Sequence, residues 1–184
     1  DSIWSNSRLA YFSLALSIAA VSVPYWLASL VPAADLAQHL TQIQQLRFIL
    51  AGHDSGEFEI ARWYFPNTLV YLPLALCLQA APPLVAGKIM MVFLSTSWIA
   101  GSFLLAWNRR RSVLAFLITV PIAFNFLFNW GLLNFLVGWP IFCWLAFATE
   151  KPVTKAQIPL IAAIGLLLYY AHILWFIFAN LWLI

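Results

Sequence analysis

Apolar residues run through this chain in stretches long enough to cross a lipid bilayer. Hydrophobic residues make up 64% of the 184 residues, charged residues only 8%, and the mean hydropathy is +0.91. A water-soluble domain of this length needs far more polar surface. Many of the tryptophans and tyrosines stand near the ends of the apolar runs, where their amphipathic rings favour the headgroup region. The sequence therefore predicts an integral membrane protein.

The lengths of the runs predict an all-α fold, a polytopic transmembrane helical bundle. A spanning helix needs about 20 apolar residues. The expected transmembrane helices cover residues 9–31, 85–107, 113–128, 132–148 and 158–183. A shorter run at 67–81 contains Pro73 and ends at a proline pair, which indicates a tilted span or an interfacial or re-entrant helix. We expect one transmembrane domain over 1–184, belonging to a longer protein.

The basic residues leave the topology open. If the run at 67–81 does not cross, the amino terminus, Arg109–Arg111, Lys151 and Lys155 are cytoplasmic and the loop at 32–66 is outside. If it crosses, the amino terminus is outside and that loop is inside. Both arrangements keep the arginine cluster inside, so the positive-inside rule does not choose between them.

The remaining composition excludes some classes of function. The net charge of +3 is dispersed apart from the three arginines, so we expect no nucleic-acid partner. Cys77 and Cys143 lie within apolar runs and are expected to be core residues rather than a disulfide or a metal motif.

Polar chemistry concentrates in the loop at 32–66. Four of the six acidic residues and two of the three histidines lie there. Within it, apolar positions recur at helical spacing over 35–50, opposite a polar stripe. This pattern predicts a juxtamembrane amphipathic helix on the membrane surface, ended by Gly52.

Asp35 and His39 are the candidate catalytic residues. Residues four apart lie on one helix face, so the carboxylate and the imidazole are positioned to share a proton or a substrate hydroxyl. The alternative for Asp35 is a helix N-cap, a role for which aspartate is well suited. The alternative for His39 is a plain interfacial polar residue. Two ligands alone predict no metal site, although a divalent metal remains an alternative.

Five further residues are candidates for binding substrate. Arg62 and Lys88 carry charges suited to a lipid phosphate, although basic residues also extend to the interface for solvation alone. Asn129, Asn134 and His172 stand within apolar runs, where polar groups must face protein or a wet cavity. Interhelical hydrogen bonding and a tight turn at residues 129–131 are the structural alternative for this group.

The order of these features resembles the membrane part of the GT-C glycosyltransferases. It comprises Asp-x-x-x-His after the first helix, a surface helix, a short proline-containing helix, Gly-Leu-Leu-Asn-Phe, and a helix with Tyr-x-His. The resemblance implies a bacterial inner-membrane protein whose first extracytoplasmic loop carries the active-site acid, at the position of Asp35. It also implies a non-crossing helix at 67–81. No second acidic motif and no soluble domain accompany these features in the sequence.

This resemblance implies transfer of a sugar from a polyprenyl-phosphate donor, with membrane lipids and the lipid-linked donor as partners. Asp35 would act as general base, and His39 would orient it. Arg62, Lys88 or His172 would offset phosphate charge. The alternative is a non-catalytic subunit of a membrane complex. Haem held by His39 and His172 is disfavoured because the two lie on different kinds of segment. A transporter remains an alternative, although no inverted repeat is visible.

Overall fold

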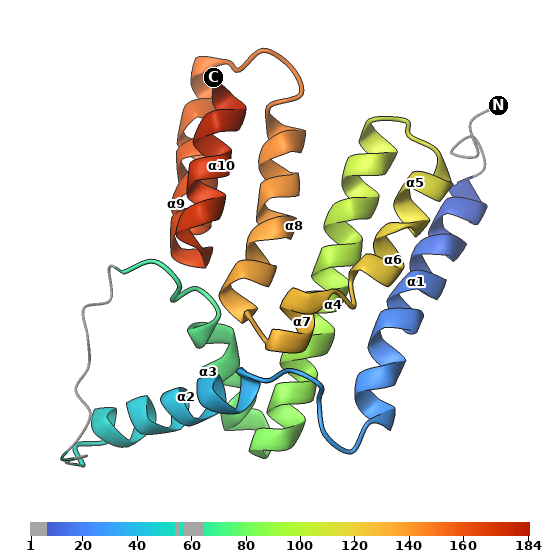
Figure 1. The fold of residues 1–184 in the computed structure, drawn as a ribbon. Coiled ribbons are helices and arrows are strands. Elements are labelled where there is room, and N and C mark those ends of the chain that lie inside the picture. The colour runs from blue at the N-terminus through green and yellow to red at the C-terminus, as the bar shows by residue number, and fades with distance from the viewer. Residues whose placement is uncertain (1–6, 54–55, 57–64) are drawn as a thin grey trace.

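The computed structural model describes residues 7–53, 56 and 65–184. These residues form helices and turns without a strand, which confirms the all-α fold (Figure 1). The bounds of the helices are α1 Ser7–Leu27, α2 Leu36–Leu50, α3 Tyr71–Ala80, α4 Pro83–Asn108, α5 Val113–Leu117, α6 Thr119–Ile122, α7 Phe126–Trp130, α8 Leu133–Ala148, η2 Lys155–Gln157, α9 Ile158–Ala171 and α10 Ile173–Leu183.

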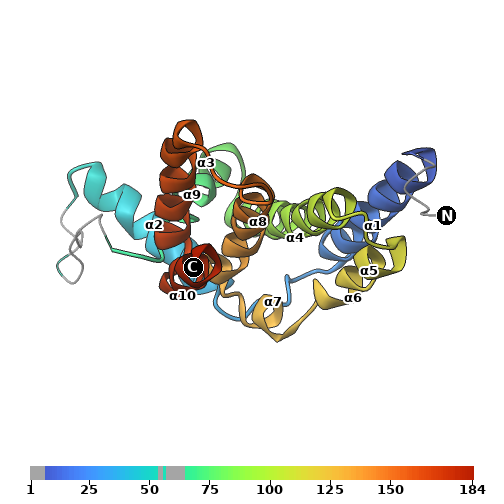
Figure 2. The same ribbon diagram turned by 90° about the horizontal axis from the view of Figure 1, so that it is seen from above.

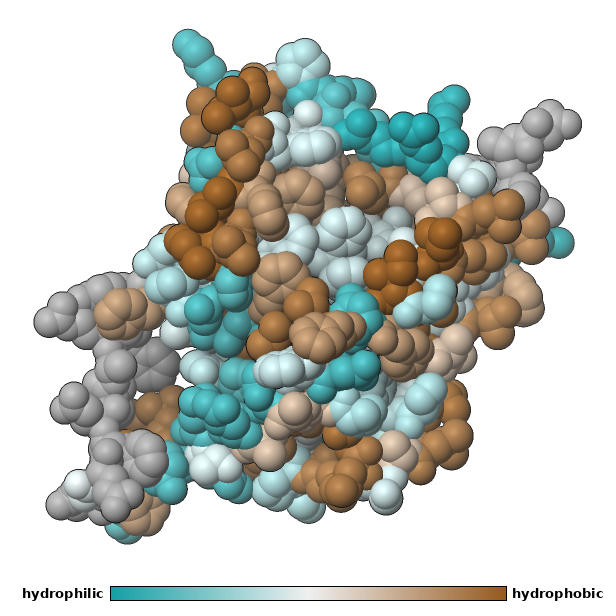
Figure 3. Space-filling model, in the orientation of Figure 1, coloured by the Kyte–Doolittle hydropathy of each residue, from teal (hydrophilic) through white to brown (hydrophobic). Residues whose placement is uncertain are grey.

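Three helical stretches are long and apolar enough to span a membrane, which indicates a membrane protein. They are Arg8–Leu27, Pro83–Asn108 and Val113–Trp130. Viewed along the bundle, α8, α4 and α1 lie in a row, with α5 to α7 along one side of it (Figure 2). Apolar surface covers α5, α9 and α10, while hydrophilic surface gathers near the α4–α5 turn and over α2 (Figure 3).

The core lies where α4 packs between α1 and α8. Gly101 allows the closest approach, because a Cβ there would lie 3.0 Å from the Cα of Pro140 on α8. Gly138 is covered by the Trp175 ring, which a Cβ would overlap. The small residues therefore let helices meet at backbone distance, as in many membrane bundles.

Two ranges expected as single transmembrane helices are interrupted. The stretch at 113–128 remains a candidate span, whereas the expectation of one helix over 158–183 is wrong. Residues 113–130 form α5, α6 and α7, because Pro121 lacks an N–H and the Asn125 side chain caps a new helix at 2.7 Å from the Leu127 nitrogen. The range 158–183 breaks at His172, whose extended backbone (φ −165°, ψ 136°) separates α9 from α10. These two helices pack side by side as a hairpin.

The short helix α3 also forms a hairpin, with α4. Its ten residues rise about 15 Å, too little to cross the hydrocarbon core. It packs against the first half of α4, while α2 lies roughly across the long helices at the same end of the molecule (Figure 1). The amphipathic helix predicted for 35–50 thus lies across one end of the bundle.

Basic residues gather at the opposite end. Arg8 begins α1, Arg109–Arg111 follow α4, and Lys151 and Lys155 lie between α8 and α9. An ion pair between Arg109 and Glu150 at 3.6 Å joins two of these segments, and the tilted rings of Tyr11 and Trp107 lie 5.7 Å apart between α1 and α4. Six of the eight described basic residues therefore lie on segments at this end of the bundle.

Candidate functional site

Four interruptions of the helical chain lie close together at the amino-terminal end of α8. They are the loop before α2, the α7–α8 turn, the segment before α3 and the α9–α10 break. The loop before α2 is held against the α7–α8 turn by two backbone hydrogen bonds. The Ala34 N–H donates to the Asn129 carbonyl at 2.9 Å, and the Asp35 N–H donates to the Trp130 carbonyl at 2.8 Å. These bonds fix where α2 begins relative to α8.

Gly131 makes this contact possible. Its φ of +78° is a left-handed conformation that residues with a Cβ adopt only at a cost. A Cβ would also lie 3.1 Å from the backbone nitrogens of both Asp35 and Leu36. Gly131 therefore allows both the left-handed turn before α8 and the close packing of the start of α2 against it.

The segment before α3 is bonded to the α9–α10 break. The N–H groups of Thr68 and Leu69 donate to the Tyr170 carbonyl at 2.9 and 3.0 Å, next to the α9–α10 break. The buried Asn134 side chain accepts from the Val70 N–H at 3.3 Å, where α3 starts. Backbone groups freed by two helix ends are thus satisfied across the junction.

A cavity of about 280 Å³ lies within this junction. We call it the junction cavity. Its lining residues are Asp35, Gln38, His39, Gln42, Asn67, Tyr71, Leu132, Leu133, Asn134, Phe135 and His172. Four residues predicted from the sequence, Asp35, His39, Asn134 and His172, are brought together here from three separate segments.

Asp35 stands at the N-cap position of α2 but does not cap the helix through its side chain. Its backbone is helical (φ −83°, ψ −5°), and its carboxylate makes no capping hydrogen bond. The N-cap interpretation is therefore wrong for the side chain, although the position is right. The carboxylate lines the junction cavity instead.

His39 is half-buried one helical turn further along. Its Nδ1 atom is buried and has no hydrogen-bond partner in the described part of the chain. Burial lowers the pKa of His39, and the nearby Asp35 carboxylate, the Gln42 side chain and the Gly131 carbonyl only partly oppose this. The imidazole is therefore neutral at pH 7 and able to accept or pass on a proton.

His172 enters the cavity from the α9–α10 break. Its Nδ1 accepts the Leu174 N–H at 3.2 Å, so the side chain caps α10. This bond assigns the proton of the neutral ring to Nε2. The ring packs edge-on against Phe135, 5.3 Å between centroids.

The sequence pattern did not single out four polar lining residues, Gln38, Gln42, Asn67 and Tyr71. Gln38 and Gln42 continue the stripe begun by Asp35 and His39, so their helical spacing was a usable signal. Tyr71 donates its hydroxyl proton to the Gln42 carbonyl oxygen at 2.9 Å and packs beside the His39 ring. Asn67 (φ 66°) and Tyr71 reach the cavity through long-range folding alone.

Two of the described residues predicted to bind substrate, Lys88 and Asn129, do not line the junction cavity. Lys88 is half-buried on α4, and its ammonium donates to the Ala28 carbonyl at 2.7 Å. Asn129 is exposed and contributes its backbone carbonyl to the α2 contact. Arg62 lies outside the described residues. Among the residues that are described, no group of three or more His, Cys, Asp or Glu side chains is arranged to hold a metal ion.

No protein-family model, curated protein or solved structure matches the chain. Its function is therefore argued from the site itself.

Proposed function

We propose that the chain is the membrane part of a GT-C-like glycosyltransferase, which transfers a sugar from a polyprenyl-phosphate donor at the junction cavity. The observation that carries the proposal is the convergence of Asp35, His39 and His172 on one polar cavity of a membrane protein. The Asp35 carboxylate is not used to cap its own helix. A carboxylate that lines a polar cavity and makes no capping bond is suited to act on a substrate.

The chemistry assigned to Asp35 is general base catalysis. As the acceptor hydroxyl attacks the anomeric carbon, a glycosidic C–O bond forms and the bond from that carbon to the donor phosphate oxygen breaks. The hydroxyl proton passes to the Asp35 carboxylate, and the polyprenyl phosphate leaves with the bonding electron pair. His39 lies beside Asp35 as a positioning residue. The amides of Gln38, Gln42 and Asn134 offer donors and acceptors for sugar hydroxyls.

The gathering of most described basic residues at one end of the bundle supports an extracytoplasmic cavity. Arg8, Arg109–Arg111, Lys151 and Lys155 lie on segments at the end opposite α2. The positive-inside rule assigns such an end to the cytoplasm. The fold also supports a non-crossing α3, because this helix is short and turns back into α4. In a bacterium, the corresponding location is the inner membrane.

The direct test is a transfer assay in vesicles with a set of polyprenyl-phosphate hexoses as donors. Asp35→Asn should lower the rate by about 100-fold or more, because the base is lost. Its thermal midpoint should stay near that of the wild type, because the side chain makes no capping bond. Glu150→Gln is the matched carboxyl-to-amide control at the other end of the molecule and should keep the rate. Equal rates for the wild type and Asp35→Asn would contradict the proposal.

A non-catalytic subunit is the second candidate. It is favoured by the structural use of several cavity residues, since Asn134 holds the start of α3 and His172 caps α10. In that case Asp35→Asn would leave assembly and stability unchanged, whereas Asn134→Ala would weaken both.

A further inference from the structure

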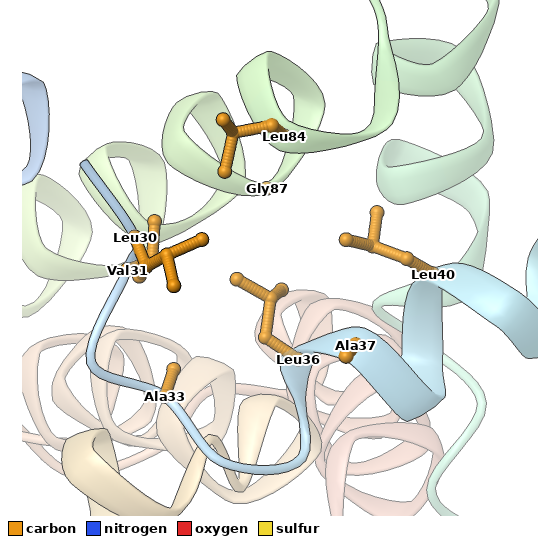
Figure 4. A pocket seen from close by; sticks show the side chains of 8 residues that line it. All are labelled: Leu30, Val31, Ala33, Leu36, Ala37, Leu40, Leu84 and Gly87. Carbon is orange, nitrogen blue, oxygen red and sulfur yellow. The ribbon is translucent and has the colours of Figure 1, made fainter.

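A second cavity, of about 240 Å³, lies on the other side of the first turns of α2. We call it the apolar groove. Its lining side chains come from three segments and are all apolar: Leu30, Val31, Ala33, Leu36, Ala37, Leu40, Leu84 and the Cα of Gly87. Figure 4 shows the leucine and valine side chains converging on a common space from α2, from α4 and from the loop after α1.

Gly87 forms one wall of this groove and sets the distance between α2 and α4. A Cβ at this position would lie 3.0 Å from Leu36 Cδ2 and 3.4 Å from Leu40 Cδ1. A larger side chain would therefore project into the space between these leucines. The groove remains open because residue 87 has no side chain.

Lys88 follows Gly87 on α4 but does not itself line the groove. The Lys88 ammonium donates one proton to the Ala28 carbonyl, two residues before Leu30 in the loop that lines the groove. An ammonium has three donors, so two remain for another acceptor. Within residues 7–53, 56 and 65–184, no carboxylate lies within ion-pair distance of Lys88. An apolar slot beside an ammonium complements an acyl chain that ends in an anionic headgroup.

We propose that the apolar groove binds one acyl chain of an anionic glycerophospholipid whose phosphate pairs with Lys88. This site is distinct from the junction cavity and does not rest on sugar transfer. The membrane supplies such chains at high local concentration, and apolar surface is stabilised when it is covered by lipid rather than water. Because Leu36 lines the groove next to Asp35, an acyl chain bound there would support the start of α2 from the side opposite the junction cavity.

The test uses phosphatidylglycerol with a diazirine in its acyl chain, at trace level in phosphatidylcholine vesicles that contain the full chain. After irradiation, labelled residues are mapped by mass spectrometry. Labelling should concentrate on Leu36, Leu40 and Leu84 in the wild type. Gly87→Val fills the groove and should lower this labelling severalfold. Lys88→Gln removes the charge and should lower it for phosphatidylglycerol while leaving a phosphatidylcholine probe unchanged.

Gly165→Val is the matched control. Gly165 lines a larger apolar groove on α9 and α10, of about 490 Å³, whose lining includes no lysine or arginine. A Cβ at Gly165 meets no described atom within 4 Å. In this variant, the probe should label residues 36, 40 and 84 to the same extent as in the wild type. If Gly87→Val fails to fold, the Lys88→Gln variant and the phosphatidylcholine probe still test the proposal. Equal labelling by both headgroups, unchanged in Lys88→Gln, would overturn the proposal.

Discussion

The polar groups that join the long helices differ from two polar groups at the junction cavity, those of Asp35 and His39. In the bundle, the Ser95 hydroxyl donates to the Tyr25 hydroxyl at 3.1 Å, and the Trp139 N–H donates to the Ser102 hydroxyl at 2.9 Å. Each pair joins two helices. At the junction cavity, by contrast, the Asp35 carboxylate does not cap its helix and the buried Nδ1 of His39 lacks a partner among the described residues.

The difference separates groups that hold the fold from groups available to a ligand. A buried polar atom without a partner costs free energy, so its retention is more readily explained by a ligand than by stability. Trp98 is the exception in the bundle. Its buried N–H also has no described partner, but its ring is surrounded by the rings of Phe128 and Trp139.

The largest loss of stability should come from Gly131→Ala. The left-handed backbone and the 3.1 Å approach to two backbone nitrogens together predict a loss of about 2 kcal/mol or more in the free energy of unfolding. Thermal denaturation in detergent measures it. Gly52→Ala is the matched control, because φ is +84° there but no described atom lies within 4 Å of the added Cβ. Equal losses for both variants would mean that the contact with the start of α2 contributes nothing.

A smaller loss is expected from Asn134→Ala. Removing the amide leaves the Val70 N–H without its acceptor at the start of α3, which should cost about 1 to 2 kcal/mol. Denaturation of the purified protein is again the measurement. Asn180→Ala is the control, because that exposed amide bonds only to the Phe176 carbonyl on its own helix among the described residues. If the two asparagine variants are equally stable, Asn134 belongs with the groups available to a ligand.

The smallest effect should be a pH dependence of stability that originates at His39. Because burial lowers the pKa of His39 in the folded protein, the unfolded chain binds a proton more readily. The free energy of unfolding should therefore be fully retained above the unfolded pKa of about 6.5 and fall as the pH drops through that value toward the folded pKa. His39→Gln should reduce this decline in denaturation series. A variant with the same pH profile as the wild type would show that the imidazole is not desolvated.

The sequence predicted α2 and α3 from local pattern, but not the breaks at Pro121 and Asn125. The apolar stripe and Gly52 located α2, and Pro73 with the following proline pair indicated the short α3 that turns back into α4. The break at His172 was missed, because no glycine or proline marks it. Hydrogen bonds from Thr68 and Leu69, about a hundred residues away in sequence, satisfy the Tyr170 carbonyl beside that break. Such contacts leave no local signal.

Local patterns in the sequence also predicted part of the candidate site. Helical spacing paired Asp35 with His39, and the cost of polar groups in lipid singled out Asn134 and His172. Charge was a poor guide to which residues line the junction cavity. Lys88 was selected for its charge but contacts the end of α1, whereas Tyr71 and Gln42 carry no charge and line the cavity.

We propose that the junction cavity opens to the extracytoplasmic side and is available to a ligand. The most direct test is labelling of Gln38→Cys by a membrane-impermeant maleimide on intact cells, with Cys77 and Cys143 replaced. Gln38 is exposed at the cavity, and Lys151→Cys, at the opposite end, is the matched control. We expect Gln38→Cys to be labelled at once and Lys151→Cys to be labelled only after the membrane is opened. The reverse pattern would place the cavity on the cytoplasmic side and rule out an extracytoplasmic site.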